Sequence, residues 1–173
     1  ARPFILRRLK RDVLTDLPDL LEVHQTLDLL PNQHRSYQRV IEDLKRRPNS
    51  RTLAILNELR TICDFDDATG ESSKVVRITE IIESIASKGE KAVVFSFLLK
   101  PIDLLKSAIG SRLGPNAVLE LRGDQSYEDR SDALESFKND DKAVVLLGSS
   151  RVAGEGLTLT EANHVLFFNR WWN

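Results

Sequence analysis

The sequence is poor in the residues that build disulfides, metal centres and membrane spans. Cys63 is the only cysteine, and the three histidines form no spaced cluster with acidic residues, so an internal disulfide is excluded and no metal site is indicated. No apolar run approaches the roughly eighteen residues that a membrane-spanning helix needs, and no signal-peptide pattern opens the chain. We therefore expect an intracellular protein with no membrane partner.

Methionine is absent as well, even at position 1, which indicates a fragment of a longer protein. The chain also lacks GxxxxGK[ST], the loop that cradles nucleotide phosphates, and it has no strand that ends in an Asp-Glu pair to hold magnesium. If this domain serves a nucleotide, the main phosphate-binding loop must therefore lie on another domain.

Composition allows one good-sized domain, or one domain with an appendage. Hydrophobic residues make up 41% of the 173 residues, which is enough for a buried core. The net charge of −1 conceals local clustering, because the stretch ARPFILRRLKR at the start holds five basic residues and no acidic one. This basic start is either an ordinary solvated face, which composition alone favours, or a surface for a nucleic acid.

The chain divides into two regions of different texture, residues 1–73 and 74–173. The first region contains no convincing buried strand and predicts two amphipathic helices, over 32–47 and 50–63. In the second region, predicted helices and strands alternate: helices over 74–89, 101–114 and 126–140, and strands over 91–97, 117–121, 143–148 and 164–169. Apolar strands separated by helices indicate an α/β fold with a parallel sheet, preceded by a mainly helical segment.

The polar loops that follow the predicted strands are the candidate binding sites. In an open parallel sheet, ligands bind where the carboxyl ends of the strands meet. Hydroxyl groups, cations and exposed backbone N–H groups are the partners that phosphates need. The side chains that we expect to converge at this edge are Ser96, Lys100, Arg122, Ser149, Ser150 and Arg151.

Two glycines, Gly154 and Gly156, flank Glu155 in the loop after the third predicted strand. Glycine at these positions allows a positive φ and lets the backbone come close to a ligand. The two glycines could equally serve only to turn the chain, because glycines spaced by one residue are a weak signal. From the residues alone, both interpretations stay open.

Five stretches of the sequence together carry a family resemblance. They are RPFILRRLKRDVLTDLP (2–18), LNELRTICD (56–64), SSKVVRITEII (72–82), KAVVFSF (91–97) and AGEGLTLTEANHVLFFNRWWN (153–173). In this order they resemble the crossing segment, the Leu-Arg-x-x-Cys helix, the Ser-x-Lys helix, motif IV and motif V of the Swi/Snf-type ATPases, the DNA-translocating branch of helicase superfamily two. The resemblance is to the second RecA-like lobe, and it implies a three-layer RecA-like sheet with flanking helices.

The sequence departs from the usual family pattern at several positions. An Asn-His-Pro triplet usually follows the helix cysteine, and here Asp64, Phe65 and Asp66 stand in its place. The strand after motif V usually ends in D-R-W-W-N-P, and here Asn169 replaces the aspartate. Within motif V, Thr158 replaces the usual asparagine.

The resemblance implies a motor in which two RecA-like lobes sandwich ATP. The first lobe supplies the phosphate-loop lysine and the magnesium-binding acids, and the motif VI arginines of the second lobe reach the phosphates. Motif VI would begin shortly after Asn173, so we expect no catalytic residue within this chain. ATP and Mg²⁺ are expected cofactors of the full-length protein, with none bound by this fragment alone, which should be inactive.

The resemblance also implies roles for individual residues. Ser149, Ser150 and Arg151 are expected at DNA phosphates. The nucleotide side is expected to be lined by Gly154, Glu155 and Gly156. The further candidates for contact with the DNA backbone are Ser96, Lys100, Arg122, Gly123 and Trp172.

The implied partners are the N-terminal RecA-like lobe of the same protein, the backbone of double-stranded DNA and a DNA-bound protein complex. The setting would be the cytoplasm or nucleoid of a bacterium, or the nucleus of a eukaryote. The alternative is a non-catalytic α/β module that binds proteins or nucleic acid without a motor cycle. A phosphate loop with an Asp-Glu box upstream in the parent gene, and paired arginines downstream, would favour the motor.

Overall fold

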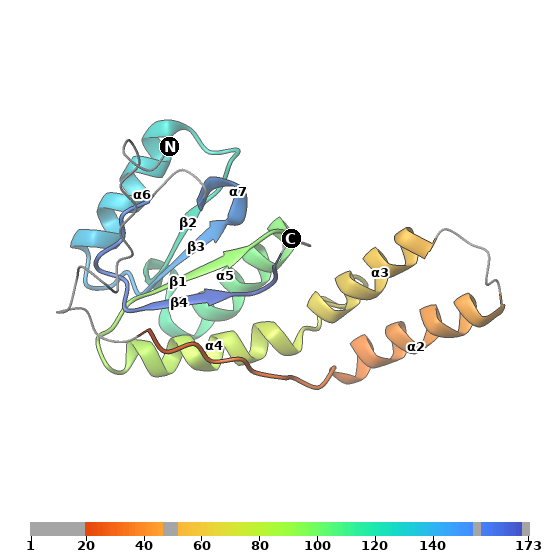
Figure 1. The fold of residues 1–173 in the computed structure, drawn as a ribbon. Coiled ribbons are helices and arrows are strands. Elements are labelled where there is room, and N and C mark those ends of the chain that lie inside the picture. Colours follow the sequence, from red (N-terminus) through yellow and green to blue (C-terminus); the bar gives the residue numbers. More distant parts are fainter. Residues whose placement is uncertain (1–19, 47–51, 154–156, 171–173) are drawn as a thin grey trace, which may run out of the picture.

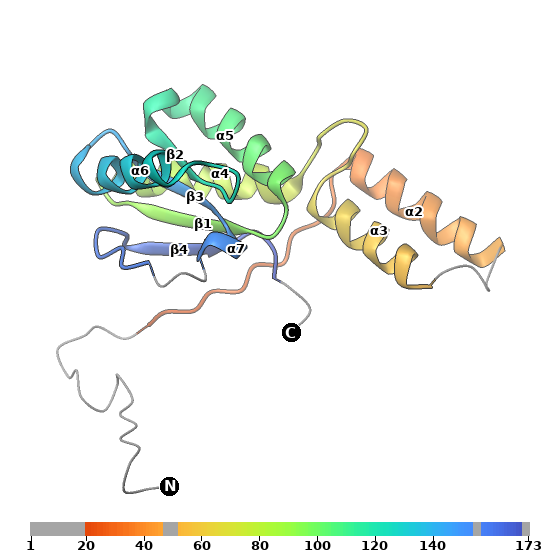
Figure 2. The same cartoon turned by 90° about the horizontal axis from the view of Figure 1, so that it is seen from above.

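The computed structural model of this protein describes residues 20–46, 52–153 and 157–170. These residues form an α/β lobe and a helical hairpin that projects from one end of the lobe (Figures 1 and 2). In chain order the elements are α2 (Pro31–Arg46), α3 (Thr52–Asp64), α4 (Ser73–Ala86), β1 (Ala92–Ser96), α5 (Leu99–Leu113), η2 (Pro115–Ala117), β2 (Val118–Leu121), α6 (Tyr127–Asn139), β3 (Val145–Ser149), α7 (Ser150–Ala153) and β4 (His164–Phe167).

The sheet has four strands in the order β2-β3-β1-β4, and every neighbouring pair is parallel. Val94 in the middle of β1 lies opposite Leu147 of β3 and Leu166 of β4, which sets the register at the centre of the sheet. The parallel sheet predicted from the sequence is therefore confirmed. Because all strands run the same way, their carboxyl ends meet at one edge, which we call the carboxyl edge.

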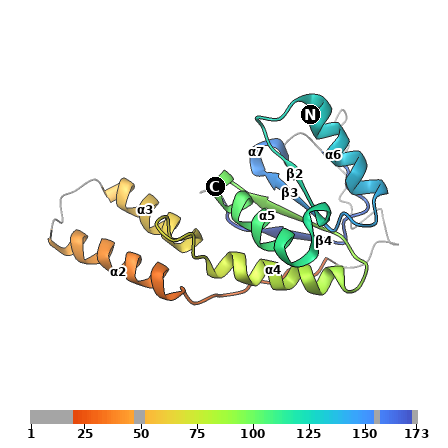
Figure 3. The ribbon, with the colours of Figure 1, turned by 180° about the vertical axis from the view of Figure 1, so that it is seen from behind.

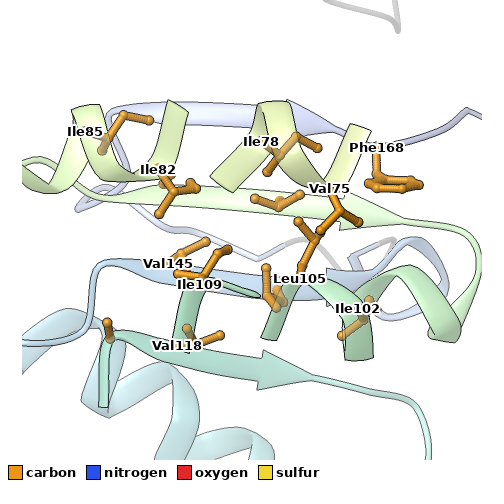
Figure 4. Packing of buried hydrophobic residues seen from close by; sticks show 14 residues of the cluster. Val75, Ile78, Ile82, Ile85, Ile102, Leu105, Ile109, Val118, Val145 and Phe168 are labelled. Atoms are coloured by element: carbon orange, nitrogen blue, oxygen red, sulfur yellow. The ribbon is translucent and has the colours of Figure 1, made fainter. Parts of the chain in front are cut away.

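Side chains along β1 alternate between two cores. Ala92 and Val94 face a core that α4 and α5 cover, whereas Val93 faces a core that α6 and α7 cover. Figure 3 shows α4 and α5 together beside the strands, and Figure 4 shows their side chains meeting those of the sheet in the first core. The order of layers is therefore helices, sheet, helices, as the resemblance implies.

An apolar stripe fixes α4 to the sheet. Val75, Ile78, Ile82 and Ile85 recur at helical spacing and are all buried in the first core (Figure 4). The hydroxyl of Ser72 caps the helix, because it accepts a hydrogen bond from the N–H of Val75 at 3.1 Å. Together with α5, this helix covers one face of the sheet.

Two details differ from the sequence-based expectation. The helix expected over 101–114 begins two residues earlier, at Leu99, so that Pro101 lies in the first turn. Proline is tolerated there, because the N–H groups of the first turn have no acceptor within the helix. The loop expected after β3 begins with the short helix α7. Its Val152 is buried in the second core, and this burial favours a helical turn over an open loop.

The hairpin of α2 and α3 has a small core of its own. Val40 of α2 is buried together with Leu59 and Ile62 of α3. Leu53 and Leu56, nearer the start of α3, are exposed. The amphipathic pattern of α3 is therefore buried only in the half of the helix that lies near the lobe.

A buried glutamine joins the hairpin to the lobe. Gln33 is completely buried, and its Nε2 donates to the carbonyl oxygen of Ile62 at 2.7 Å. Its Oε1 accepts from the N–H of Ser73, the first residue of α4, at 2.9 Å. Pulling the hairpin away from the lobe would break the bond between Oε1 and Ser73, and the loss of such a hydrogen bond to a buried group costs about 1–3 kcal/mol. The base of the hairpin is therefore fixed to the lobe.

Asp66 adds a second link at the same junction. Its carboxylate accepts from the hydroxyl of Ser36 in α2 at 2.5 Å, and from the hydroxyl and N–H of Thr69 at 2.8 and 2.9 Å. The hydrogen bond from Ser36, followed by those from Thr69, holds the pKa of Asp66 below its ordinary value. The carboxylate therefore ties α2 to the turn between α3 and α4.

We predict that Asp66 makes the chain sensitive to acid. Because its pKa is lower in the folded state than in the unfolded state, Asp66 stabilises the fold at neutral pH. This contribution is lost as the pH falls from about 4, the ordinary pKa of aspartate, through the lowered value. In urea unfolding, Asp66→Asn should be less stable than the parent chain at pH 7, and the difference should shrink at pH 3.

The neighbouring Asp67 is exposed and serves as the matched control. Asp67→Asn should leave the free energy of unfolding near that of the parent at both pH values. A difference between Asp66→Asn and the parent that stays constant from pH 7 to pH 3 would contradict the assignment.

Candidate functional site at the carboxyl edge of the sheet

The carboxyl edge collects the polar residues that follow three strands. Ser96 ends β1 and lies opposite Ser149, which ends β3. Arg122 follows Leu121, the last residue of β2. Ser150 begins α7 directly after β3. The structure therefore brings Ser96, Arg122, Ser149 and Ser150 to one edge, as the sequence predicts, while the contacts that they make with a ligand stay a prediction.

The hydroxyl of Ser96 is used inside the protein. Ser96 is completely buried, and its Oγ accepts from the N–H of Leu98 at 3.2 Å and donates to the carbonyl oxygen of Leu98 at 2.9 Å. Ser149 is also buried. In this conformation a phosphate at the edge would meet little of either side chain, and Ser96 instead shapes the turn that leads into α5.

Lys100 and Gly123 lie on the open part of the edge. Lys100 is exposed in the first turn of α5, next to the end of β1. Gly123 is exposed just after β2, and a Cβ placed there would come no closer than 3.7 Å to Val152 of α7. Gly123 therefore lies beside α7 but has room for a side chain, so close packing does not require glycine at this position.

Arg122 lies among carboxylates. Its guanidinium group is 2.7 Å from Asp103 of α5, 3.5 Å from Asp124 and 3.8 Å from Glu120 of β2. The hydrogen bond to Asp103 contributes most to raising the pKa of Arg122. The side chain borders a groove of about 400 Å³ between α5 and β2, which Lys106 also lines. Arg122 is therefore tied to the flank of α5, and it would have to exchange carboxylates for phosphate to bind DNA.

The remaining predicted residues lie wholly or partly outside the described part of the chain. Arg151 belongs to α7, but its side chain is outside the described residues. The same holds for the whole of Gly154, Glu155, Gly156 and Trp172. What the structure adds is the starting point of this segment, because α7 leaves β3 at the carboxyl edge.

A mainly apolar pocket lies beside α7 on the sheet face away from α4 and α5. Its volume is about 510 Å³, and its lining is Val93, Phe95, Ser150, Leu157, Leu159, Ala162, Val165 and Phe167. Val165 and Phe167 are each 56% exposed, and the ring centroids of Phe95 and Phe167 lie 5.9 Å apart. None of the described residues that line this pocket is charged, so they offer apolar contact rather than a cradle for phosphate.

Two features of the edge escaped the sequence analysis. Gly148 lies beside the ring of Phe95, and a Cβ at Gly148 would come within 2.9 Å of that ring, so any larger residue would have to displace it. The only signal in the sequence is a glycine at the end of an apolar strand. The second feature is a buried contact between Asp64 and Asn169, whose side chains form a hydrogen bond of 2.7 Å. The sequence marks both residues only as departures from a family pattern.

Metal and membrane sites were not expected from the composition. Within residues 20–46, 52–153 and 157–170, no three histidine, cysteine, aspartate or glutamate side chains gather as a metal site. Over the same ranges, no helix is long and apolar enough to cross a bilayer. His164 lies 2.6 Å from Glu90, a contact that holds the start of β4 beside the end of the α4–β1 loop.

Comparison of the sequence and the fold with known proteins shows the family to which the chain belongs. Residues 73–173 match the family described as "Helicase conserved C-terminal domain", and the chain belongs to that family. Over 99% of its length, the chain is 32% identical to the SWI2/SNF2 ATPase core of Sulfolobus solfataricus in complex with dsDNA, with a TM-score of 0.78 and coverage of 40% of that chain. Among helicase C-terminal domains, the chain is thus the C-terminal lobe of a Swi/Snf-type protein, with the RecA-like fold that the resemblance implies.

Two relatives support the same branch. The chain is 30% identical over 192 residues to YwqA of Bacillus subtilis (strain 168), an alignment that covers 99% of this chain and 21% of YwqA. It is 28% identical to the mouse protein named SWI/SNF-related matrix-associated actin-dependent regulator of chromatin subfamily A member 1, covering 99% of this chain and 18% of that protein. The chain therefore spans about a fifth of the length of these relatives.

We predict that the hydroxyl of Ser96 stabilises the turn after β1. Ser96→Ala removes both hydrogen bonds to Leu98, and the free energy of unfolding should fall by about 1–2 kcal/mol. Ser111→Ala is the control, because Ser111 is exposed on α5 and donates only to a carbonyl of its own helix. Its effect should stay within about 0.5 kcal/mol. Equal losses in the two variants, measured by urea unfolding, would contradict the role of Ser96.

Proposed function

We propose that this chain is the second motor lobe of an ATP-dependent double-stranded DNA translocase or remodeller of the Swi/Snf type. The observation that carries the proposal is the match, along 99% of the chain, to a SWI2/SNF2 ATPase core in complex with dsDNA. The name of YwqA describes an ATP-dependent helicase/translocase, which supports the use of ATP by this protein.

The lobe would act on ATP only together with a first lobe. The sequence has no phosphate-cradling loop and no Asp-Glu pair for magnesium, so those groups would come from the N-terminal RecA-like lobe of the same protein. ATP and Mg²⁺ would be held between the lobes, with Gly154, Glu155 and Gly156 on the nucleotide side. ATP binding would close the cleft and hydrolysis would open it, as a hinge motion between domains.

The carboxyl edge would face the DNA backbone. Lys100 is exposed there, and Ser150 and Arg151 begin α7 at the same edge. Cations, hydroxyls and N–H groups of this kind bind phosphates without reading bases, so binding should be non-specific and sensitive to salt. Trp172 would add a contact beyond β4. Ser96, Ser149, Arg122 and Gly123 would shape this edge, with Arg122 reaching DNA only if it leaves Asp103.

A DNA-bound protein complex would be the object that such a motor moves. The mouse relative is named as a regulator of chromatin, which supports this class of partner for the motor. Because the proposed substrate is cellular DNA, the protein would work in the cytoplasm or nucleoid of a bacterium, or in the nucleus of a eukaryote.

We predict that ATP hydrolysis requires both lobes. Isolated residues 1–173 should release no phosphate from ATP, with or without double-stranded DNA. The full-length protein that carries this chain should hydrolyse ATP faster when DNA is added, because DNA orders the two lobes into the closed arrangement. DNA-dependent turnover by residues 1–173 alone, or no DNA stimulation of the full-length protein, would contradict the proposal.

We also predict that cations at the carboxyl edge bind DNA phosphates. In the full-length protein, Arg151→Ala and Lys100→Ala should each weaken DNA-stimulated ATPase activity. Each should also reduce the slope of log affinity against log salt by about one. Lys88→Ala is the control, because Lys88 is also exposed but lies between α4 and β1, at the opposite edge of the sheet. If Lys88→Ala lowers the salt slope as much as the other two variants, the carboxyl edge is not the DNA surface.

A further inference from the structure

Four residues from four separate segments form a continuous line of hydrogen bonds beneath the carboxyl edge. The N–H of Phe97, just after β1, donates to Oδ1 of Asn169 at 2.8 Å. Nδ2 of Asn169, just after β4, donates to Oδ2 of Asp64 at 2.7 Å. Nζ of Lys74 in α4 donates to Oδ1 of Asp64, the last residue of α3, at 2.5 Å. We call this line the relay.

The centre of the relay is shielded from water. Asp64 is 1% exposed and Asn169 is 8% exposed. A polar group at this depth must be paired inside the protein, because water cannot replace a missing partner. Lys74 closes the relay on its outer side, where its ammonium group also lies 5.4 Å from the ring centroid of Phe168.

Both ends of the relay are groups that only donate. A backbone N–H and an ammonium group accept nothing, so the side chains at 64 and 169 must each turn an oxygen outward, toward Lys74 and Phe97 respectively. Between them, one side chain must then donate and the other must accept. An amide has one oxygen and one NH₂ group, and a carboxylate has two oxygens, so only one amide with one carboxylate completes the line.

From this geometry we infer that positions 64 and 169 form a reciprocal pair, which needs one amide and one carboxylate, in either order. The pair holds the end of α3 against the segments that follow β1 and β4, both of which lead onto the proposed DNA-facing edge. With two amides, either the two NH₂ groups would face each other, or one NH₂ group would face the ammonium of Lys74 or the N–H of Phe97. Two carboxylates would set oxygen against oxygen inside the protein. Asparagine at 64 with aspartate at 169 would keep every hydrogen bond.

The two partners are remote in the sequence. Asp64 and Asn169 lie 105 residues apart, yet their side chains meet in one hydrogen bond. The pairing rule therefore concerns a contact that only the tertiary fold creates.

The relay lies where it can position the DNA-facing segments. Phe97 lies three residues before the exposed Lys100. Asn169 lies directly before Arg170 and three residues before Trp172. Asp64 belongs to the hairpin, so the relay joins the hairpin to both segments. On the basis of the proposed function, Asp64 and Asn169 are positioning residues for DNA-stimulated ATP hydrolysis, and neither contacts DNA or ATP itself.

The test compares four full-length proteins: the parent, Asp64→Asn, Asn169→Asp and the double swap Asp64→Asn/Asn169→Asp. Each single variant should raise the DNA concentration that gives half-maximal ATPase stimulation, by on the order of tenfold. The double swap should return this concentration to within about threefold of the parent, because every hydrogen bond of the relay is possible again. Recovery should fall short of complete, because the carboxylate then lies at position 169, one side chain farther from Lys74. Urea unfolding of the same four proteins should follow the same order.

A control variant tests whether any added carboxylate would have the effect that we expect of Asn169→Asp. Asn163 is exposed, and its Oδ1 accepts from the N–H of Lys91 at 3.1 Å, a bond that Asn163→Asp retains. This variant should match the parent in both measurements.

Each outcome decides between the alternatives. If the single variants fail to fold and the double swap folds, the pairing rule is supported, and the DNA response of the swap then tests the positioning role. A double swap no better than the worse single variant would overturn the inference, as would single variants that are destabilised but respond to DNA like the parent. A parent without DNA stimulation would instead contradict the proposed motor function, while the order of the four unfolding free energies would still test the pairing rule.

Discussion

The common direction of the four strands is the constraint on which the rest of this structure depends. Parallel pairing in the order β2-β3-β1-β4 requires each connection to cross back over a face of the sheet, which accounts for the helices on both faces. The same pairing brings the ends of β1 and β3 together at Ser96 and Ser149. One edge therefore receives the loops of every strand, and any ligand that this lobe shares with another domain is most simply bound there.

Buried polar groups then decide how the hairpin and the lobe fit together. Apolar packing is not directional and would tolerate several angles between them. The amide of Gln33 bonds to Ile62 in the hairpin and to Ser73 in the lobe, and the carboxylate of Asp66 holds α2 against the turn that leads to α4. These directional contacts select one arrangement. Asn169 and Asp64 do the same at the end of β4. The polar contacts thus supply the specificity that the hydrophobic core lacks.

Much of the fold could be predicted from the sequence, because its signals are local. The apolar strands and the stripe along α4 repeat with clear periods, and Ser126 with Asp129 marks the start of α6. The ion pairs of Arg122 and the burial of Ser96 could not be predicted, because each depends on residues that only the tertiary fold brings near. For the same reason the sequence indicated that these polar residues gather at one edge of the sheet, but not that Ser96 and Ser149 are buried there.

The hairpin that Gln33 fastens to the lobe has a mechanical consequence. Its first helix contains 16 residues, so it forms an arm about 24 Å long. An arm that is stiff and clamped at its base works as a lever: a tilt of about 10° where it joins the sheet would carry its far end through about 4 Å, given that length. Small displacements of the lobe would therefore be magnified at the tip, where the exposed Leu53 lies in the first turn of the second helix.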